Sequence, residues 1–544
     1  MKKIRIKYGR DLRLLLLCCV LFLLLAVLAV AGKKNLHEDE VYTYGLSNHR
    51  GGINFEPELG RKYEDAAQPY REYMATQPDG RLDYRHVWGK QCADVHPPFY
   101  YYLVHTICSF FMDTYSVWFA AVINLGSSVV TILLLYRITC LLGQRRLALT
   151  VCFFFAVSPG ILQMNTFLRM YVMTMMWICA VTWWHLAFAQ GDASGEKEDG
   201  RNRLPVYFYL GLIVLAVLGA LTHYYFLVFL FFQCLCFGCH LLYRKRFGDA
   251  VKYALSLGIA GLVCYWHFPT MVRHIFHGYR GMDSINRLKE ATGYPHKLFI
   301  FWNFMDSVLF GGFLAVILLG VLIAVVCHVW MKKHGKQTAS LFWEKKRICR
   351  ILVMVPAACY FLLVSKAAVM EEERYVSPVY GLAIVIGICL SAGLAERITD
   401  KMGMGERRKK MVYGICLLVF LTAGYIRCPW YYSFRESIPA LEAAEKYSEN
   451  DCIFIASTDI EGNMFRCHRS FYEVSKYRSL TFIPKEDLSM LAQKGYNGYD
   501  HMVVYIINKT DREAVLAEIL ELCPNLTEYT KISEFGQAAG YYLE

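Results

Sequence analysis

The chain has 544 residues, of which 56% are hydrophobic and only 19% are charged. This composition excludes an ordinary soluble enzyme and is typical of a protein with many membrane spans. The net charge of +12 is accounted for by short basic loops between apolar runs, so it does not indicate a nucleic-acid partner.

Eleven apolar runs have a length suited to crossing a bilayer, for which about 17–25 residues are needed. They cover approximately residues 14–31, 115–135, 147–163, 169–188, 206–221, 224–243, 250–268, 309–329, 351–365, 379–395 and 411–426. The first run is longer than the 7–15 apolar residues of a signal peptide, so we interpret it as a retained span.

Lysine and arginine concentrate before the first run and in every second connection, at 145–146, 244–246, 332–333, 345–347 and 407–410. The positive-inside rule therefore predicts a cytoplasmic N-terminus. Residues 99–112 are also apolar, but a span there would reverse this pattern. We expect that segment to be an interfacial or partly inserted helix.

A long polar segment, residues 32–98, follows the first run, and it begins with the letters L-H-E-D-E-V-Y. Its three consecutive acids are Glu38, Asp39 and Glu40. Acids favour the first turn of a helix, where the dipole is positive, so a plain helix start is one interpretation. The other is a catalytic carboxylate that faces a substrate head group at the membrane surface.

Asp39 and Glu40 are adjacent, so on a helix their side chains point in different directions and cannot flank one glycosidic bond as a hydrolase pair does. One carboxylate suffices as a base when the leaving group is a phosphate, because a phosphate held by positive charge departs without a general acid. The constellation therefore favours transfer from a lipid-linked phosphate.

The polar segment ends in D-V-H-P-P-F-Y-Y-Y, which contains Asp94, His96 and Tyr102. Paired prolines suit the first turn of the apolar helix that follows. Asp94 either caps that helix or belongs to the active site.

Two later connections on the same predicted side carry polar residues at otherwise apolar hairpins. The first contains Arg169 and Tyr171 in R-M-Y, and the second contains His223 and Tyr224 in T-H-Y-Y. Snorkelling of arginine to the head-group layer and packing of helix ends are the alternatives to a ligand-binding role.

Two more segments are expected on the external side. Residues 269–307 form a basic connection that could act as a lid, and residues 366–378 contain Arg374 and Tyr375 in E-R-Y-V-S-P. Beyond the last run, residues 437–544 alternate helical patterns with four short apolar strands, near 452–456, 480–483, 502–507 and 541–543. We expect a small α/β accessory domain there.

Five motifs occur in order over roughly residues 10–400. They are D-E after the first run, H-P-P-F-Y-Y-Y, R-M-Y, T-H-Y-Y and E-R-Y-V-S-P. Together they resemble the membrane glycosyltransferases of the GT-C fold, and most of all glycosyltransferase family 39. That family includes the protein O-mannosyltransferases and is similar to the aminoarabinose transferases.

This resemblance implies a sugar donor linked to polyprenyl phosphate and transfer with inversion. It implies that Asp39 is the base that activates the acceptor, that Glu40 orients the loop, and that Arg169, Arg374 and Tyr375 hold the phosphate. Asp94 is grouped with the catalytic residues without an assigned step. The remaining substrate-binding residues that it suggests are His96, Tyr102, Tyr171, His223 and Tyr224.

The prediction is therefore a mainly α polytopic membrane protein of the GT-C fold, with about eleven spans and a small extracytoplasmic α/β domain. Residues 1–430 form the transferase domain, with 32–98 as its first external catalytic loop, and residues 437–544 form the second domain. The partners are the lipid-linked donor, membrane lipid, and a protein, lipid or glycan acceptor. Some relatives bind a divalent metal ion, of which this sequence gives no independent sign.

Two other functions are compatible with the sequence. A transporter or flippase of lipid-linked glycans is one, but ion-coupled transporters usually carry ionisable residues at mid-depth, and these runs have almost none. A non-catalytic scaffold that presents the external domain is the other.

Overall fold

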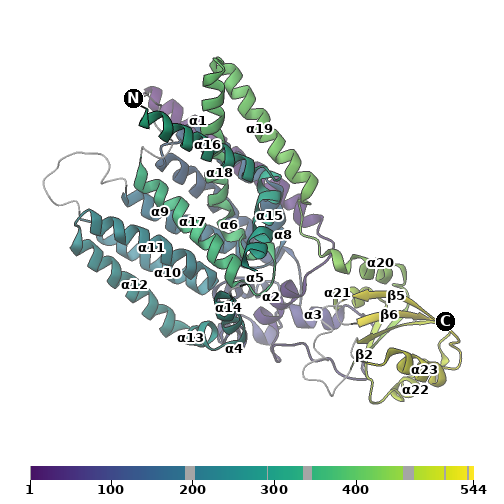
Figure 1. The fold of residues 1–544 in the computed structure, drawn as a ribbon. Helices are drawn as coiled ribbons and strands as arrows, with labels where there is room; N and C mark the ends of the chain where they lie inside the picture. Colours follow the sequence, from purple (N-terminus) through teal and green to yellow (C-terminus); the bar gives the residue numbers. More distant parts are fainter. Residues whose placement is uncertain are drawn as a thin grey trace. The chain divides into compact units, whose positions relative to one another are not determined.

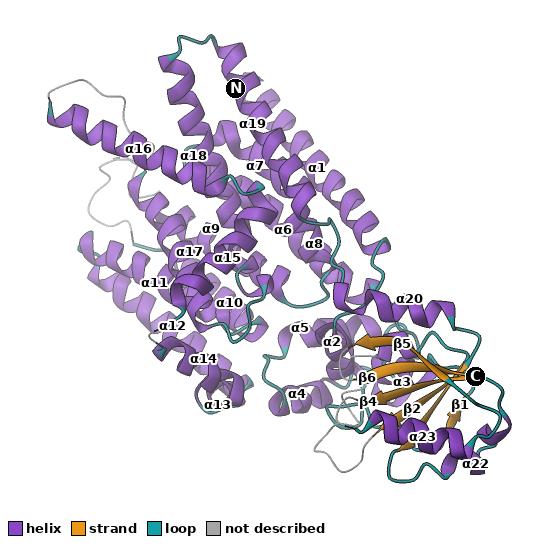
Figure 2. Ribbon diagram, turned by 45° about the vertical axis from the view of Figure 1, so that its right-hand side comes forward, coloured by secondary structure: helices purple, strands orange, loops and turns teal. Residues whose placement is uncertain are grey.

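The computed structural model of the chain describes residues 2–189, 203–290, 292–334, 346–456, 471–507, 510–535 and 538–544. These residues group into two compact units. Unit 1 comprises Met1–Gly32, Val95–Tyr100 and Ala120–Tyr432, and unit 2 comprises Lys33–Asp94, Tyr101–Phe119 and Ser433–Glu544. Unit 1 is helical, whereas unit 2 contains the sheet (Figures 1 and 2).

Unit 1 contains the membrane helices. Nine helices in the described ranges are long and apolar enough to cross a bilayer: α1 (Lys2–Ala31), α6 (Trp118–Leu141), α9 (Tyr171–Ala189), α11 (Tyr225–Tyr243), α12 (Phe247–His267), α16 (Leu314–Lys333), α17 (Arg347–Ala367), α18 (Tyr380–Lys401) and α19 (Glu406–Arg427). The apolar helix α10 (Val206–Thr222) is shorter. The prediction of a mainly α, multi-pass membrane protein is confirmed.

The third predicted run, residues 147–163, is a broken helix. It consists of α7 (Arg145–Val157) and α8 (Pro159–Thr166), which are bent by 51°. Ser158 between them has extended backbone angles, because a residue before proline is disfavoured in the helical region. Each of the eleven predicted runs thus corresponds to a helix or, here, to a bent pair.

The predicted connection 269–307 is instead three helices, α13 (Thr270–Phe276), α14 (Tyr279–Lys289) and α15 (Tyr294–Phe310). α15 packs against α17 and α19, and its Phe301 and Leu309 are buried. Polar residues such as Asp306 interrupt its apolar pattern, which is why the sequence did not reveal it. Asp306 accepts a hydrogen bond from the first backbone N–H of α16 at 2.9 Å.

Unit 2 contains a six-stranded sheet in the order β1-β3-β2-β4-β6-β5. The strands are β1 (Lys62–Tyr63), β2 (Asp451–Ala456), β3 (Ser479–Pro484), β4 (Met502–Ile507), β5 (Tyr529–Phe535) and β6 (Ala538–Leu543). β2 runs parallel to β3 and β4, and the remaining pairs are antiparallel. The four predicted strands are present, whereas β1 and β5 were missed.

Both faces of the sheet are covered. Ile453 and Ile455 of β2 pack with residues of α23 (Arg512–Leu522) on one face, next to α22 (Met490–Gln493). Figure 2 shows α20 (Ile438–Lys446) on the other side of the sheet from α23. The short helix α21 (Phe471–Val474) precedes β3.

Aromatic residues from the segment after α1 also pack on the sheet. The rings of Phe55 and Tyr63 lie 6.0 Å and 6.3 Å from the ring of Phe482 in β3. The same segment forms α2 (Glu38–Asn48), α3 (Gln68–Met74) and α4 (Tyr84–Ala93), and α5 (Phe99–Cys108) follows it. The predicted division assigned residues 32–98 to the membrane domain, but in the structure residues 33–94 group with the C-terminal segment.

Candidate active site

Two of the predicted phosphate-binding and substrate-binding residues of unit 1 contact each other directly. Arg169 lies between α8 and α9 and is 3% exposed. Its Nη2 donates to Nε2 of His96 at 3.2 Å. Because the guanidinium has only donors, Nε2 of His96 is the acceptor in this contact.

His223 follows the C-terminus of α10 and belongs to the same group. Its Nδ1 accepts a hydrogen bond from the backbone N–H of Tyr225 at 3.0 Å. Burial, together with the neighbouring His96 and Arg169, lowers the pKa of His223 well below its usual value. The ring is therefore neutral at pH 7, and its remaining nitrogen, Nε2, carries a proton that it can donate.

Arg374 stacks between aromatic rings. It is 7% exposed, and its guanidinium carbon lies 5.6 Å from the ring centre of Phe167 and 5.5 Å from that of Tyr375. Cation–π contacts of this kind partly offset the cost of burying the charge. The hydroxyl of Tyr360 donates to the backbone oxygen of Tyr375 at 2.9 Å, which fixes the turn that carries Arg374.

This turn is a 3₁₀ turn, Glu373–Tyr375. α18 begins only at Tyr380. The hydroxyl of Tyr380 donates to the carboxyl of Glu373 at 3.1 Å. Burial raises the pKa of Glu373 to about 7, so its charge changes near neutral pH.

Aromatic rings join these groups. Tyr171 lies 5.2 Å from His223 and 6.4 Å from Tyr375, and Tyr225 lies 5.2 Å from His223 and 5.7 Å from Tyr375. We call the set His96, Arg169, Tyr171, His223, Tyr225, Arg374 and Tyr375 the arginine–histidine cluster.

Tyr224 contacts a residue of α13. Its hydroxyl is 2.8 Å from Nδ1 of His274 in α13. Tyr225, which the sequence analysis did not select, takes the place expected for Tyr224. The motif T-H-Y-Y contains both tyrosines, and the sequence alone does not show which of them turns toward His223.

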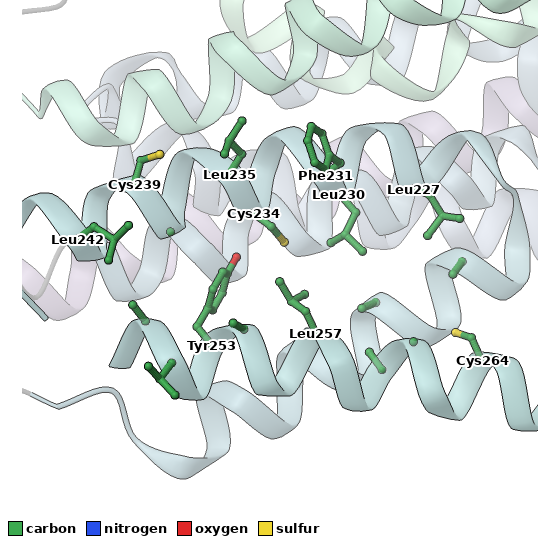
Figure 3. Close-up of a pocket in the computed structure, with 18 of the residues that line it drawn as sticks. Leu227, Leu230, Phe231, Cys234, Leu235, Cys239, Leu242, Tyr253, Leu257 and Cys264 are labelled. Atoms are coloured by element: carbon green, nitrogen blue, oxygen red, sulfur yellow. The ribbon is translucent and has the colours of Figure 1, made fainter. Parts of the chain in front are cut away.

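An apolar groove of about 740 Å³ lies in the same unit between α10, α11 and α12. Leu230 and Cys234 of α11 point toward Tyr253 and Leu257 of α12 (Figure 3). Several lining residues of α12 are small: Ala250, Ala254, Ala260 and Gly261. The groove has the size and the lining of a site for a hydrocarbon ligand.

Unit 2 holds the adjacent acids at the N-terminus of α2. His37 caps this helix, and its Nδ1 accepts from the backbone N–H of Asp39 at 3.1 Å. The carboxylate of Glu40 accepts from the backbone N–H of His37 at 2.7 Å, which completes a capping box. Glu40 also forms an ion pair of 2.9 Å with Lys33, and both side chains are buried.

The two acids are therefore in different environments. Glu40 is occupied by structural contacts, whereas the side chain of Asp39 remains 26% exposed. Burial lowers the pKa of Lys33, although the charge of Glu40 opposes this change. Asp39 is therefore partly exposed, as is Glu38, whereas Glu40 is buried, and the role of Asp39 as a base stays a prediction.

The two other predicted residues of unit 2 are Asp94 and Tyr102, and Tyr102 lies within α5. Asp94 follows the C-terminus of α4, and its N–H donates to Lys90 O at 2.9 Å. Because α5 begins at Phe99, the interpretation of Asp94 as a cap of that helix is wrong. Tyr102 packs edge-on against Tyr84 at 5.8 Å, and burial raises its pKa to about 12.

The described residues contain no group of three or more His, Cys, Asp or Glu that could hold a metal ion. Glu40, one of the two acids adjacent to Asp39 in the sequence, is already held by Lys33. No step is therefore derived through a divalent metal.

No family model matches the chain, and no curated protein matches it. Solved structures that match include ArnT from Cupriavidus metallidurans bound to undecaprenyl phosphate. It is 10% identical, with 96% of this chain and 97% of that chain covered and a TM-score of 0.45.

A second match is the archaeal oligosaccharyltransferase AglB from Archaeoglobus fulgidus, in complex with an inhibitory peptide and a dolichol-phosphate. It is 12% identical, with 98% of this chain and 74% of that chain covered and a TM-score of 0.47. Both proteins have the GT-C fold that the motifs predicted. Likenesses at these TM-scores and identities do not identify the chemistry of this chain.

Proposed function

We propose that the protein is an integral-membrane glycosyltransferase. It transfers a sugar from a polyprenyl-phosphate-linked donor to an acceptor hydroxyl on the outer face of the membrane, with inversion at the sugar carbon. The observation that carries the proposal is the arginine–histidine cluster. Two buried guanidinium groups and a neutral histidine N–H meet there at the ends of apolar helices.

Such a cluster suits a lipid-linked phosphate. Arginine binds phosphate oxygens with two parallel hydrogen bonds, and burial strengthens each of them. Arg374 and Arg169 would hold the phosphate, and Nε2 of His223 would donate to one of its oxygens. The groove between α11 and α12 supports a donor with a long hydrocarbon chain, because it offers almost no polar surface.

The reaction needs one base and a stabilised leaving group. In the proposed step Asp39 takes the proton of the acceptor hydroxyl as its oxygen attacks the anomeric carbon of the sugar. The bond between that carbon and the phosphate oxygen breaks, and its electron pair stays on the phosphate. The arginines stabilise the negative charge that develops there.

The proposed orientation has the N-terminus in the cytoplasm and both the site and unit 2 outside. Cysteine labelling tests it with Lys245→Cys, between α11 and α12, and Arg478→Cys, on the surface of unit 2. On a background without reactive cysteines, we expect a membrane-impermeant reagent added outside to label position 478 and to spare position 245. Labelling of both positions from one side would contradict this orientation.

The transfer reaction is tested with the purified chain in lipid nanodiscs, which have no gradient and no second compartment. We expect a radiolabelled sugar to move from a polyprenyl-phosphate donor to an added acceptor hydroxyl. A flippase would show no transfer in nanodiscs but would move the donor across the bilayer of sealed vesicles. A scaffold would do neither, so either of these results would overturn the proposal.

A further inference from the structure

The segment that carries Asp39 contributes a strand to the C-terminal sheet. Lys62 and Tyr63 form β1, which pairs antiparallel with β3 through Thr481 and Leu480. The amino group of Lys62 contacts the buried carboxylate of Asp451 at 3.1 Å. Residues nearly 400 positions apart thus share one sheet.

Asn35 makes a second connection within unit 2. Its side-chain N–H donates to the backbone oxygen of Phe434 at 2.8 Å and to the hydroxyl of Ser437 at 2.7 Å. Its side-chain oxygen accepts from the backbone N–H of Phe434 at 3.0 Å. Asn35 is 1% exposed, so these bonds are shielded from water.

This connection lies immediately before the cap of α2. The ring of His37, the capping residue, packs on the ring of Phe434 at 4.6 Å. His37 in turn holds the backbone N–H of Asp39 and is held by Glu40. The start of the C-terminal segment therefore contacts both Asn35 and His37, only a few residues from Asp39.

We infer that the C-terminal segment is a positioning element of the active site, and that Asn35 is the residue through which it fixes the N-terminus of α2 and hence Asp39. The inference rests on the proposed function for its catalytic part. The sequence analysis treated residues 437–544 as an accessory module, whereas these contacts give the segment a direct role in orienting the base.

The test uses the full chain with Asn35→Ala, which removes all three hydrogen bonds, and Ser437→Ala, which removes one. Three quantities are measured: the transfer rate at saturating donor, the donor Kd, and hydrogen exchange of the α2 amides. We expect Asn35→Ala to lower the transfer rate at least tenfold, because a displaced catalytic group loses most of its effect. The donor Kd should stay within twofold, and the α2 amides should exchange faster.

Ser437→Ala should show the same pattern with smaller changes. It still tests the inference if Asn35→Ala does not fold. The matched control is Asn525→Ala, which removes an exposed asparagine of unit 2 that bonds to Gly498 and Asp500. This control should leave the transfer rate and the exchange of α2 unchanged.

Two results would overturn the inference. Unchanged exchange of α2 in Asn35→Ala would show that Asn35 does not anchor the helix. Faster exchange with an unchanged transfer rate would show that catalysis does not depend on the anchor. If the wild-type chain transfers no sugar at all, the proposed function fails, while the exchange measurement still decides whether the C-terminal segment holds α2.

Discussion

The arginine–histidine cluster and the N-terminus of α2 hold their functional side chains in different ways. The cluster is assembled from connections between apolar helices, and short motifs already mark most of its residues. The carboxylates of α2 are held by a capping box, a buried ion pair and contacts with a segment from the other end of the chain. The proposed donor-binding residues and the proposed base are thus held by different sets of contacts.

The largest expected effect comes from the base. Asp39→Asn keeps the size of the side chain but removes the basic oxygen, so turnover should fall by about 10²–10⁴-fold. Donor Kd and expression should change little. The control is Glu38→Gln, the neighbouring acid on the same helix. A nearly normal turnover would reject Asp39 as the base, and Asp94 would be the next candidate.

The next largest effect concerns the cluster. Arg374→Ala should weaken donor binding about 10–100-fold, because a hydrogen bond to a charged group contributes about 1.5–3 kcal/mol. Arg374→Lys should restore only part of the affinity, since lysine lacks the planar fork. Equilibrium binding of the polyprenyl-phosphate donor measures both, with the exposed Arg427→Ala as the control. Unchanged affinity in both Arg374 variants would move the phosphate site to Arg169.

A stability effect is expected in unit 2. Burial raises the pKa of Glu473 to about 8, although a backbone hydrogen bond and the hydroxyl of Ser437 oppose this change. The folded state keeps this proton while an unfolded glutamate loses it above about pH 4.5, so stability decreases as pH rises from about 4.5 to about 8.

Glu473→Gln removes this loss, and we expect its melting temperature to exceed that of the wild type by several degrees at pH 8 but not at pH 5. Thermal unfolding at the two pH values measures the difference. The exposed Glu513→Gln is the control and should show no such dependence. An equal shift at both pH values would mean that titration of Glu473 does not cause the effect.

The smallest effect concerns Glu373, whose pKa is raised by burial to about 7. As pH rises from 6 to 8 this carboxyl loses its proton and places a negative charge next to Arg374. Donor Kd should therefore increase a few-fold over this range. Glu373→Gln should flatten the dependence, whereas the exposed Glu371→Gln should keep it. A flat wild-type profile would exclude Glu373 as a modulator of the donor site.

Much of the fold could be predicted because long apolar runs and alternating basic loops are local patterns, each visible within a short stretch of sequence. Each predicted span has its helix or bent helix pair, and four short apolar strands were found. The two-residue strand β1 has no detectable pattern, and its partner β3 lies more than 400 residues away. α15 was missed because polar residues interrupt its apolar face.

The candidate site shows the same limit. Arg169, His96, His223 and Arg374 were selected from motifs and do lie in one group. Tyr225 was missed because the choice between it and Tyr224 depends on where α11 begins. The different environments of Asp39 and Glu40 depend on the ion pair between Glu40 and Lys33, which no sequence pattern predicted.

The stereochemistry of the product tests the central claim most directly. Glu40 is engaged by Lys33 and by the cap of α2, so the claim is that one carboxylate, that of Asp39, drives a single displacement. NMR of the transferred sugar, with a donor of known anomeric configuration, measures the outcome. The account predicts inversion at the anomeric carbon, and a product with retained configuration would contradict it.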